Sequence, residues 1–239
     1  MMADTGFLTA RPIAHRGLHD GNKALWENTA SAFDAAIARD FAIELDVQLS
    51  ADGVAMVFHD DTLDRLTDRE GPVAAWTAAS LGALPVGGTA DTIPTLAETL
   101  TRIGGRVPVV IEMKDNGARN GELARAVADD LADYGGPCAV MSFEQDLIAA
   151  FAATGSPVPV GLTAMGVGEA ALAAHQCAFD LGISFVSYHV AALPNRFVET
   201  VRARAMPVIT WTVRTPEEVA LTRAHADQMT FEGFDPDAP

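Results

Sequence analysis

The amino-acid sequence predicts an α/β fold, a closed (β/α)8 TIM barrel with helices covering the outside of a parallel sheet. Short β-rich runs alternate with alanine-rich helical runs along almost the whole chain, as expected for βα units. No G-x-G-x-x-G turn follows the first strand-like run, so a dinucleotide-binding sheet is disfavoured. The 239 residues are close to the roughly 250 that are usual for such a barrel, and we expect one domain over residues 1–239.

The chain contains nine strand-like runs, one more than an eight-stranded barrel needs. They cover residues 12–15, 42–49, 54–59, 108–114, 138–143, 158–163, 184–188, 208–213 and 228–231. Helical character marks residues 29–39, 95–103, 121–134, 144–153, 169–177, 195–203 and 216–224. One strand-like run is therefore surplus.

The irregular part of the chain lies between residues 42 and 93. Runs 42–49 and 54–59 are joined only by Ser50-Ala51-Asp52-Gly53, which predicts a hairpin because a parallel crossover needs a dozen or more residues. Which of the two runs leaves the barrel stays open. Residues 65–93 are rich in Gly, Pro, Thr and Asp, and we expect them to form a small excursion that could act as a lid over the site.

The charge balance limits the partners of the protein. Lys and Arg number 16 against 32 Asp and Glu, a formal net charge of −16, which disfavours nucleic acid and anionic membranes as partners. Cys138 and Cys177 have no metal-binding or redox spacing and are expected to be core residues in a reducing compartment. Residues 1–9 lack a signal-peptide pattern, and no apolar run approaches the roughly 20 residues that span a bilayer. We expect a cytoplasmic protein without stable membrane insertion; its oligomeric state stays open.

Two strand-like runs carry acidic side chains two residues apart, which places each pair on one face of its strand. Glu44 and Asp46 form the first pair, and burying both without a partner would cost several kcal/mol each. A hard divalent cation would relieve their repulsion; the alternative is two solvated acids at a strand end. Glu112 and Lys114 end another run. Glu112 could supply a third metal carboxylate and Lys114 could neutralise an anionic substrate group, or the two could form a local ion pair.

Two histidines share this predicted location. His15 ends the first strand-like run and His59 ends the third, and a histidine transfers protons readily near neutral pH. Glu27 precedes a helix and could reach the barrel mouth, whereas Asn28 or Thr29 is the expected helix cap. Trp211 is either a core aromatic or a wall of the pocket. The remaining histidines, His19, His175, His189 and His225, are expected to be structural.

Taken together, five motifs resemble the glycerophosphodiester phosphodiesterase family, in the family's order and spacing. They are His15-Arg16-Gly17, Glu27-Asn28-Thr29, Glu44-x-Asp46, His59-Asp60 and Glu112-x-Lys114, with a weaker continuation through Ser142-Phe143 and Trp211-Thr212-Val213. The resemblance implies a TIM barrel that hydrolyses glycerophosphodiesters to glycerol phosphate and an alcohol with one divalent metal, Mg2+ most often, Ca2+ or Mn2+ otherwise.

The resemblance also implies roles for individual residues. It implies that Glu44, Asp46 and Glu112 hold the metal, and that His15 and His59 act as general base and general acid in an unassigned order. Arg16 and Lys114 would bind the phosphate, with Glu27 and Trp211 as further substrate contacts.

The sequence departs from the family pattern at two places. Arg214 follows Trp211-Thr212-Val213 where the family often has Asn, and Glu232-Gly233-Phe234 stands in place of a T-D-x-P-like segment. Neither position is an expected metal ligand, so hydrolysis of a phosphodiester stays the expected reaction, and the head group stays open.

Three other functions stay open. One is a metal-assisted lyase or isomerase with Lys114 as base, and another is a non-catalytic binding barrel. The third is a lysophospholipase D-like activity on lipids, which an exposed apolar patch at the barrel mouth would favour.

Overall fold

The computed structural model describes residues 4–238 and contains one nine-stranded sheet in the order β1-β9-β8-β7-β6-β5-β4-β2-β3. Strands β1 and β2 also pair with each other, which closes eight parallel strands into a barrel. The barrel strands are β1 (Ile13–Ala14), β2 (Ala42–Leu49), β4 (Val109–Met113), β5 (Cys138–Ser142), β6 (Val160–Ala164), β7 (Phe185–His189), β8 (Val208–Val213) and β9 (Gln228–Phe231). The predicted TIM barrel is confirmed.

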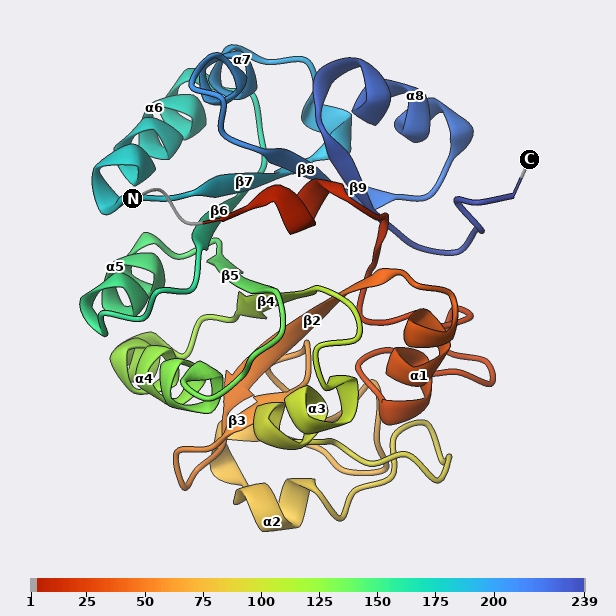
Figure 1. Ribbon diagram of the computed structural model, residues 1–239. Helices are drawn as coiled ribbons and strands as arrows, with labels where there is room; N and C mark the ends of the chain where they lie inside the picture. The colour runs from red at the N-terminus through yellow and green to blue at the C-terminus, as the bar shows by residue number, and fades with distance from the viewer. Residues whose placement is uncertain (1–3, 239) are drawn as a thin grey trace.

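The surplus strand is β3 (Ala55–Val57), which pairs antiparallel with β2 through Val47 and Val57. The run 54–59 is therefore the one that leaves the barrel, after the hairpin turn that the sequence predicts. The excursion that follows contains the 3-10 helix η2 (Val73–Ala75) and the short helix α2 (Ala78–Leu81), which lie outside the ring of strands (Figure 1). A separate hydrophobic cluster holds this region together and includes Met56, Phe58 and Leu63.

Helices surround the strands on the outside, as Figure 1 shows. They are α1 (Ala30–Ala38), α3 (Leu96–Ile103), α4 (Asn120–Leu131), α5 (Gln145–Ala153), α6 (Glu169–Cys177), α7 (Arg196–Ala203) and α8 (Pro216–His225). Thr29 caps α1 by accepting from the Ala32 N–H, and Thr95 and Thr215 begin α3 and α8 with complete capping boxes. Short 3-10 helices η3 (Gly117–Arg119), η4 (Ala178–Leu181) and η5 (Val190–Ala192) complete the connections.

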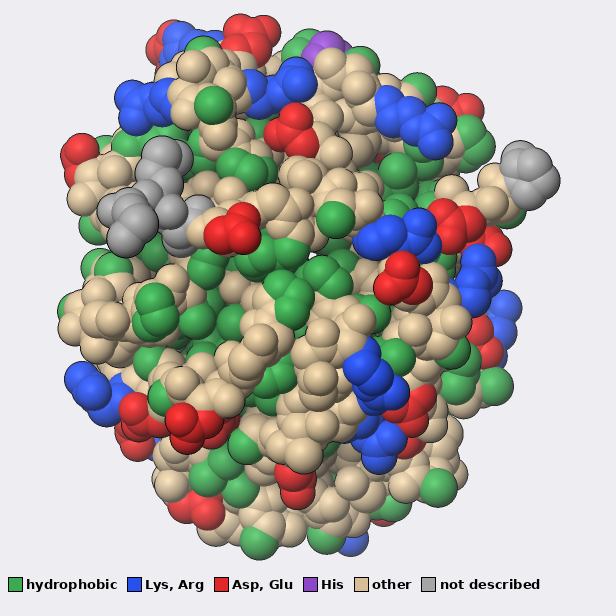
Figure 2. Space-filling view, in the orientation of Figure 1, with side chains coloured by type: hydrophobic (Ala, Val, Ile, Leu, Met, Phe, Trp, Pro, Cys, Tyr) green, Lys and Arg blue, Asp and Glu red, His purple; other side chains and the backbone are tan. Residues whose placement is uncertain are grey.

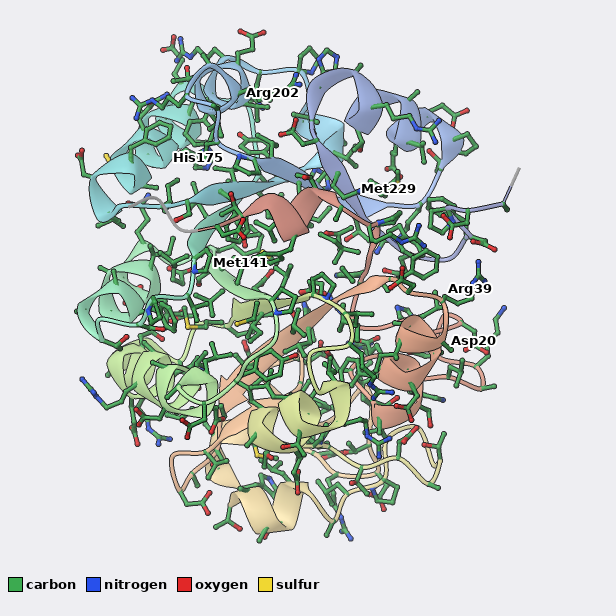
Figure 3. All side chains as sticks on the ribbon, in the orientation of Figure 1. Asp20, Arg39, Met141, His175, Arg202 and Met229 are labelled. Carbon is green, nitrogen blue, oxygen red and sulfur yellow. The ribbon has the colours of Figure 1, made fainter. Side chains whose placement is uncertain are left out.

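The amino end of the barrel is plugged. The 3-10 helix η1 (Gly6–Thr9) lies in front of the strands in Figure 1, and its Leu8 packs among side chains inside the barrel. That cluster also contains Ile13, Ala42, Val110, Ala139, Met141 (labelled in Figure 3), Phe185 and Ile209. Side chains two residues apart share a face of a strand. The next inward-facing residues along each strand therefore lie closer to the carboxyl end of the barrel.

The surface at the amino end carries mixed charge. Figure 2 shows basic side chains beside acidic ones around the edge of this face, and Figure 3 shows Arg39 near the C-terminal segment. Arg39 pairs with Asp235 at 2.9 Å and Arg11 pairs with Asp237 at 3.0 Å, so the segment after β9 is held against the barrel. Among residues 4–238, no helix has the length and apolarity needed to cross a bilayer.

Candidate active site at the carboxyl end of the barrel

The predicted carboxylates meet inside the barrel near the carboxyl ends of β2 and β4. Glu44 and Asp46 lie two apart on β2, and the sheet register places Asp46 directly beside Glu112 of β4. All three side chains are buried, and each offers an oxygen within 4.8 Å of the other two. We call Glu44, Asp46 and Glu112 the acidic cluster. Their donor chemistry suits a hard divalent cation.

Two basic side chains contact this acidic cluster. Lys114 Nζ lies 2.8 Å from Asp46 Oδ1 and also donates to Glu112, while Arg16 Nε lies 3.3 Å from Asp46 Oδ2. Burial alone would raise the pKa of Asp46, but Lys114 and Arg16 outweigh it and hold that pKa well below its usual range. Asp46 is therefore ionised at neutral pH and already shared between two cations.

Glu44 differs from Asp46 in its surroundings. No Lys or Arg side chain within residues 4–238 pairs with Glu44; its Oε2 instead accepts the backbone N–H of Arg16 at 2.9 Å. Arg16 adopts a left-handed backbone conformation (φ 56°) to present this N–H. Burial, together with the charges of Asp46 and Glu112, raises the pKa of Glu44 well above its ordinary value. A bound cation would oppose this shift, because its charge favours the ionised carboxylate.

His15 is held by a carboxylate that the sequence interpretation did not assign to the site. His15 Nδ1 lies 2.8 Å from Glu232 Oε2, and an ionised carboxylate can only accept, so Nδ1 carries the proton. His15 Nε2 is then the free nitrogen, 4.0 Å from Glu44 Oε2. Arg214 donates to the same Glu232 oxygen at 2.8 Å. Burial lowers the pKa of His15, opposed by the hydrogen bond to Glu232.

His59, which follows β3, has a matching arrangement; β3 pairs with the same edge of β2 as β1 does. Nδ1 of His59 lies 2.7 Å from Asp60 Oδ1, and Gln48 of β2 donates to the backbone carbonyl of His59 at 3.0 Å. Burial lowers the pKa of His59, and the charge of Asp46 opposes this. Each predicted histidine therefore has Nδ1 committed to a carboxylate and Nε2 available for chemistry.

Glu27 is buried, and both of its carboxylate oxygens are engaged by arginine side chains. Both oxygens accept from Arg65 at 2.8 Å, and Oε1 also accepts from Arg16 at 2.6 Å. Burial alone would raise the pKa of Glu27, but the hydrogen bonds of Arg65 and the charge of Arg16 hold it well below its usual range. Arg65 binds Asp60 as well, so it ties the excursion to both Glu27 and the partner of His59.

Trp211 lies half-buried on β8, and its Nε1 donates to the Ser187 carbonyl at 3.3 Å. Its ring packs against those of Phe143 and His189 in T-shaped arrangements, with centroid distances of 5.3 and 4.9 Å. Phe143 follows β5, so this aromatic contact reaches across the ends of β6 and β7. Trp211 therefore belongs to an aromatic group with Phe143 and His189.

Several residues of the site escaped the sequence interpretation. Asn28, expected only as a possible helix cap, donates from Nδ2 to Asp46 Oδ2 at 2.9 Å. His19, expected to be structural, offers a ring nitrogen near His15 and Glu232; one ligand atom from each of the three residues lies within 4.8 Å of the other two. Away from the site, Cys138 is buried as expected, whereas the expectation that Cys177 lies in the core is wrong, because Cys177 is exposed. A usable signal existed for Glu232, because it directly follows β9 and β9 pairs with β1, which precedes His15.

The charges of the ion-paired network do not balance. When all six carboxylates are ionised, as metal binding requires, they face four cationic side chains, which leaves two negative charges in excess. The carboxylates are Glu27, Glu44, Asp46, Asp60, Glu112 and Glu232, and the cations are Arg16, Arg65, Lys114 and Arg214. One divalent cation would neutralise this network, so the residues present fit a metal ion.

Comparison with known proteins agrees with this geometry. The structure resembles a phosphodiesterase from Oleispira antarctica solved with its product sn-glycerol-3-phosphate (TM-score 0.84, 24% identity, covering 95% of this chain and 94% of that one). It also resembles a glycerophosphodiester phosphodiesterase from Thermotoga maritima (TM-score 0.75, 24% identity, covering 93% and 95%). These likenesses support the fold.

Relatives are found by sequence as well. A glycerophosphodiester phosphodiesterase of Caldanaerobacter subterraneus is 41% identical over 110 residues, 43% of this chain and 44% of the relative. One from Bacillus subtilis is 33% identical over 118 residues, 43% of this chain and 39% of the relative. The chain thus spans less than half the length of these curated relatives. The model of the glycerophosphoryl diester phosphodiesterase family, however, matches residues 15–231. The chain therefore belongs to the glycerophosphoryl diester phosphodiesterase family.

Proposed function

We propose that this protein hydrolyses glycerophosphodiesters to glycerol phosphate and an alcohol. The observation that carries the proposal is the pair of histidines beside the acidic cluster, each with Nδ1 held by a carboxylate. Paired histidines with free Nε2 atoms suit a reaction in which one proton is removed and another is supplied. The product bound to the Oleispira phosphodiesterase supports a small glycerophosphodiester as the substrate.

The acidic cluster would hold one divalent metal ion, Mg2+ as the first choice and Ca2+ or Mn2+ as alternatives. Carboxylate oxygens are the ligands these hard ions prefer, and the network's two excess negative charges support a divalent charge. When bound, the ion would act as a Lewis acid that stabilises negative charge developing on the phosphoryl oxygens.

Arg16 and Lys114 would orient the phosphate. Both are mostly buried, and both already contact Asp46, so their cationic groups sit at the edge of the acidic cluster. Arg16 offers a planar guanidinium that can bind two phosphate oxygens, and Lys114 offers a compact positive charge. Their hydrogen bonds would strengthen as charge develops on the phosphate in the transition state.

The histidines would move the protons. Nε2 of one histidine accepts the proton of the attacking hydroxyl, from the neighbouring glycerol hydroxyl or from water, as its oxygen bonds to phosphorus. Attack by water gives glycerol phosphate directly, whereas attack by the glycerol hydroxyl gives a cyclic phosphate that water opens to glycerol phosphate in a second step, with the two histidines in exchanged roles. The bond from phosphorus to the leaving alcohol oxygen breaks, and Nε2 of the other histidine donates the proton that this oxygen needs. Glu232 and Asp60 would keep both Nε2 atoms facing the reacting groups.

The structure speaks against the alternative of a lyase or isomerase with Lys114 as base. Burial would lower the pKa of Lys114, but Asp46 and Glu112 outweigh it and raise that pKa above its ordinary value. A lysine base needs the opposite shift. A non-catalytic binding barrel would have no use for two histidines that are both held in one tautomer.

The test is a panel of glycerophosphodiesters assayed with Mg2+, Mn2+ or Ca2+, reading released alcohol and glycerol phosphate. We expect turnover that EDTA abolishes, and loss of at least about a hundredfold in kcat for His15→Ala or His59→Ala. His225→Ala, on α8, is the matched control. A folded, metal-loaded protein that cleaves no member of the panel would refute the proposal.

The cytoplasmic location belongs to this proposal too. Both cysteines are free thiols, as expected in a reducing compartment.

A further inference from the structure

Three hydroxyl side chains inside the barrel have no hydrogen-bond partner within residues 4–238. They are Thr163 on β6, Ser187 on β7 and Thr230 on β9, with 2%, 0% and 1% of their surface accessible. The register places Ser187 beside Thr163 on one side and Ile209 on the other. Thr230 lies beside Ile13, and both Ile13 and Ile209 belong to the cluster that fills the barrel. A buried hydroxyl without a partner is destabilising, so this set indicates a ligand that can form hydrogen bonds.

These hydroxyl groups lie at the same depth in the barrel as the acidic cluster. Inward side chains of such a barrel stack in layers of four from alternate strands, and neighbouring strands are staggered by about one residue. Applied to this register, the stagger gives one layer of Glu44, Met141, Ser187 and Thr230, followed towards the carboxyl end by one of His15, Glu112, Thr163 and Trp211. Ser187 and Thr230 therefore share a layer with Glu44.

Glu44 can accept more hydrogen bonds than the protein offers it. The one hydrogen bond that its side chain accepts within residues 4–238 comes from the backbone N–H of Arg16, whereas an ionised carboxylate can accept about four. Ser187 and Thr230 can donate, yet neither hydroxyl reaches an acceptor. Polar groups that face one another inside a protein without touching are bridged by buried water, which typically forms about three hydrogen bonds.

We propose that ordered water occupies the barrel interior between Glu44 and these three hydroxyl groups. The water molecules would accept from the hydroxyl groups and donate to the carboxylate, which satisfies both sides. Glu44 disfavours an anion there, and uncharged hydroxyl groups favour water over a charged ligand. We call this the internal water site. Ser187 and Thr230 would then be positioning residues, because the water that they hold fixes the carboxylate that faces the metal.

The experiment counts long-lived internal water in the full-length, metal-free protein by magnetic relaxation dispersion of the water oxygen nucleus. The Ser187→Ala, Thr230→Val pair removes two hydroxyl groups and is expected to hold at least one such molecule fewer than wild type. Its Tm is expected to fall by about 4–8 °C. In calorimetry with Mg2+ alone, the pair is expected to bind about tenfold more weakly.

The matched control is Thr210→Val, another fully buried strand threonine, whose hydroxyl group is already bonded to that of Thr222 at 2.7 Å. We expect this control to keep the wild-type water count and Mg2+ affinity.

Each measurement can overturn the inference. A water count that the Ser187→Ala, Thr230→Val pair leaves unchanged would refute the internal water site. So would a rise in Tm, because hydroxyl groups in a dry interior without partners are better replaced by methyl groups. A lower count with unchanged Mg2+ affinity would refute the contact with Glu44. The proposed hydrolysis fails separately: a wild type that binds no Mg2+ would refute its metal site, while the water count and Tm still decide the internal water site.

Discussion

Glu232→Gln tests how much the reaction depends on the position of His15. In the wild type, His15 and Glu232 form a 2.8 Å hydrogen bond with side chains only 11% and 23% exposed, so water screens the pair weakly. A hydrogen bond to a charged group contributes about 1.5–3 kcal/mol, against about 0.5–1.5 for a neutral pair. The glutamine side chain of this variant keeps an acceptor and loses the charge, so about 1–2 kcal/mol of stabilisation for a protonated His15 disappears.

This loss predicts a fall in kcat of between about fivefold and thirtyfold, with little change in KM. The assay is steady-state hydrolysis of glycerophosphocholine at saturating Mg2+, with Glu217→Gln on the exposed start of α8 as the matched control. Imidazole nitrogen shifts in NMR would show whether His15 keeps its proton on Nδ1. A folded Glu232→Gln enzyme within about twofold of wild type would refute the reasoning.

Arg214 offers a second check, because it acts on His15 only through Glu232. Its side chain is 53% exposed, so Arg214→Gln is expected to lower kcat less than about threefold. Adding this change to Glu232→Gln should cost nothing more, since the contact it supports is already weakened. Additive losses would mean that Arg214 contacts substrate directly.

Three further predictions address stability. Arg65→Met should lower the free energy of unfolding in urea by about 1–2 kcal/mol, because buried Glu27 loses a bidentate partner. The control is Arg69→Met, at an exposed ion pair, which should change the free energy of unfolding by less than about 0.5 kcal/mol, the usual scale of surface substitutions. Mg2+ at about a hundred times its dissociation constant should stabilise the fold by about 2.7 kcal/mol in thermal unfolding, and Glu44→Gln should remove most of that gain. The hydrogen bond from His15 lowers the pKa of Glu232 to about 2, so the stability that wild type gains over Glu232→Gln should be complete above pH 4.5 and vanish as the pH falls to about 2. A stability difference between wild type and Glu232→Gln that does not vary with pH would contradict this third prediction.

Local pattern was enough to predict the barrel and the acidic cluster. The alternation of strand and helix determines the parallel sheet, and the two-residue period of a strand places Glu44 with Asp46 and Glu112 with Lys114. Which strand leaves the barrel depends on tertiary packing: β3 is excluded because it runs antiparallel to β2 and packs with the excursion's own cluster. The short Asp52-Gly53 connection allowed either outcome.

The partner of His15 lies far away in the sequence, whereas His59 bonds to the adjacent Asp60. His15 and Glu232 are 217 residues apart and meet because β1 and β9 become neighbours when the barrel closes. The two departures from the family pattern, Arg214 and Glu232, contact each other and act together on His15. The residues next to Arg214 and Glu232 do not indicate this contact; the usable signal is that closing the barrel brings the last strand beside the first.

The same network bears on the order in which ligands bind. Without a metal, Lys114 and Arg16 are both engaged by Asp46, and two unit charges about 4 Å apart attract by about 4 kcal/mol at an effective dielectric constant of about 20. A phosphate must compete with that carboxylate for the same cations. A divalent ion among the acidic cluster would neutralise Asp46 and free Lys114 and Arg16 for the phosphate. We therefore expect glycerol 3-phosphate to bind at least about tenfold more tightly with Mg2+ than with EDTA in calorimetry; equal affinity would mean that the cations reach the phosphate without the metal.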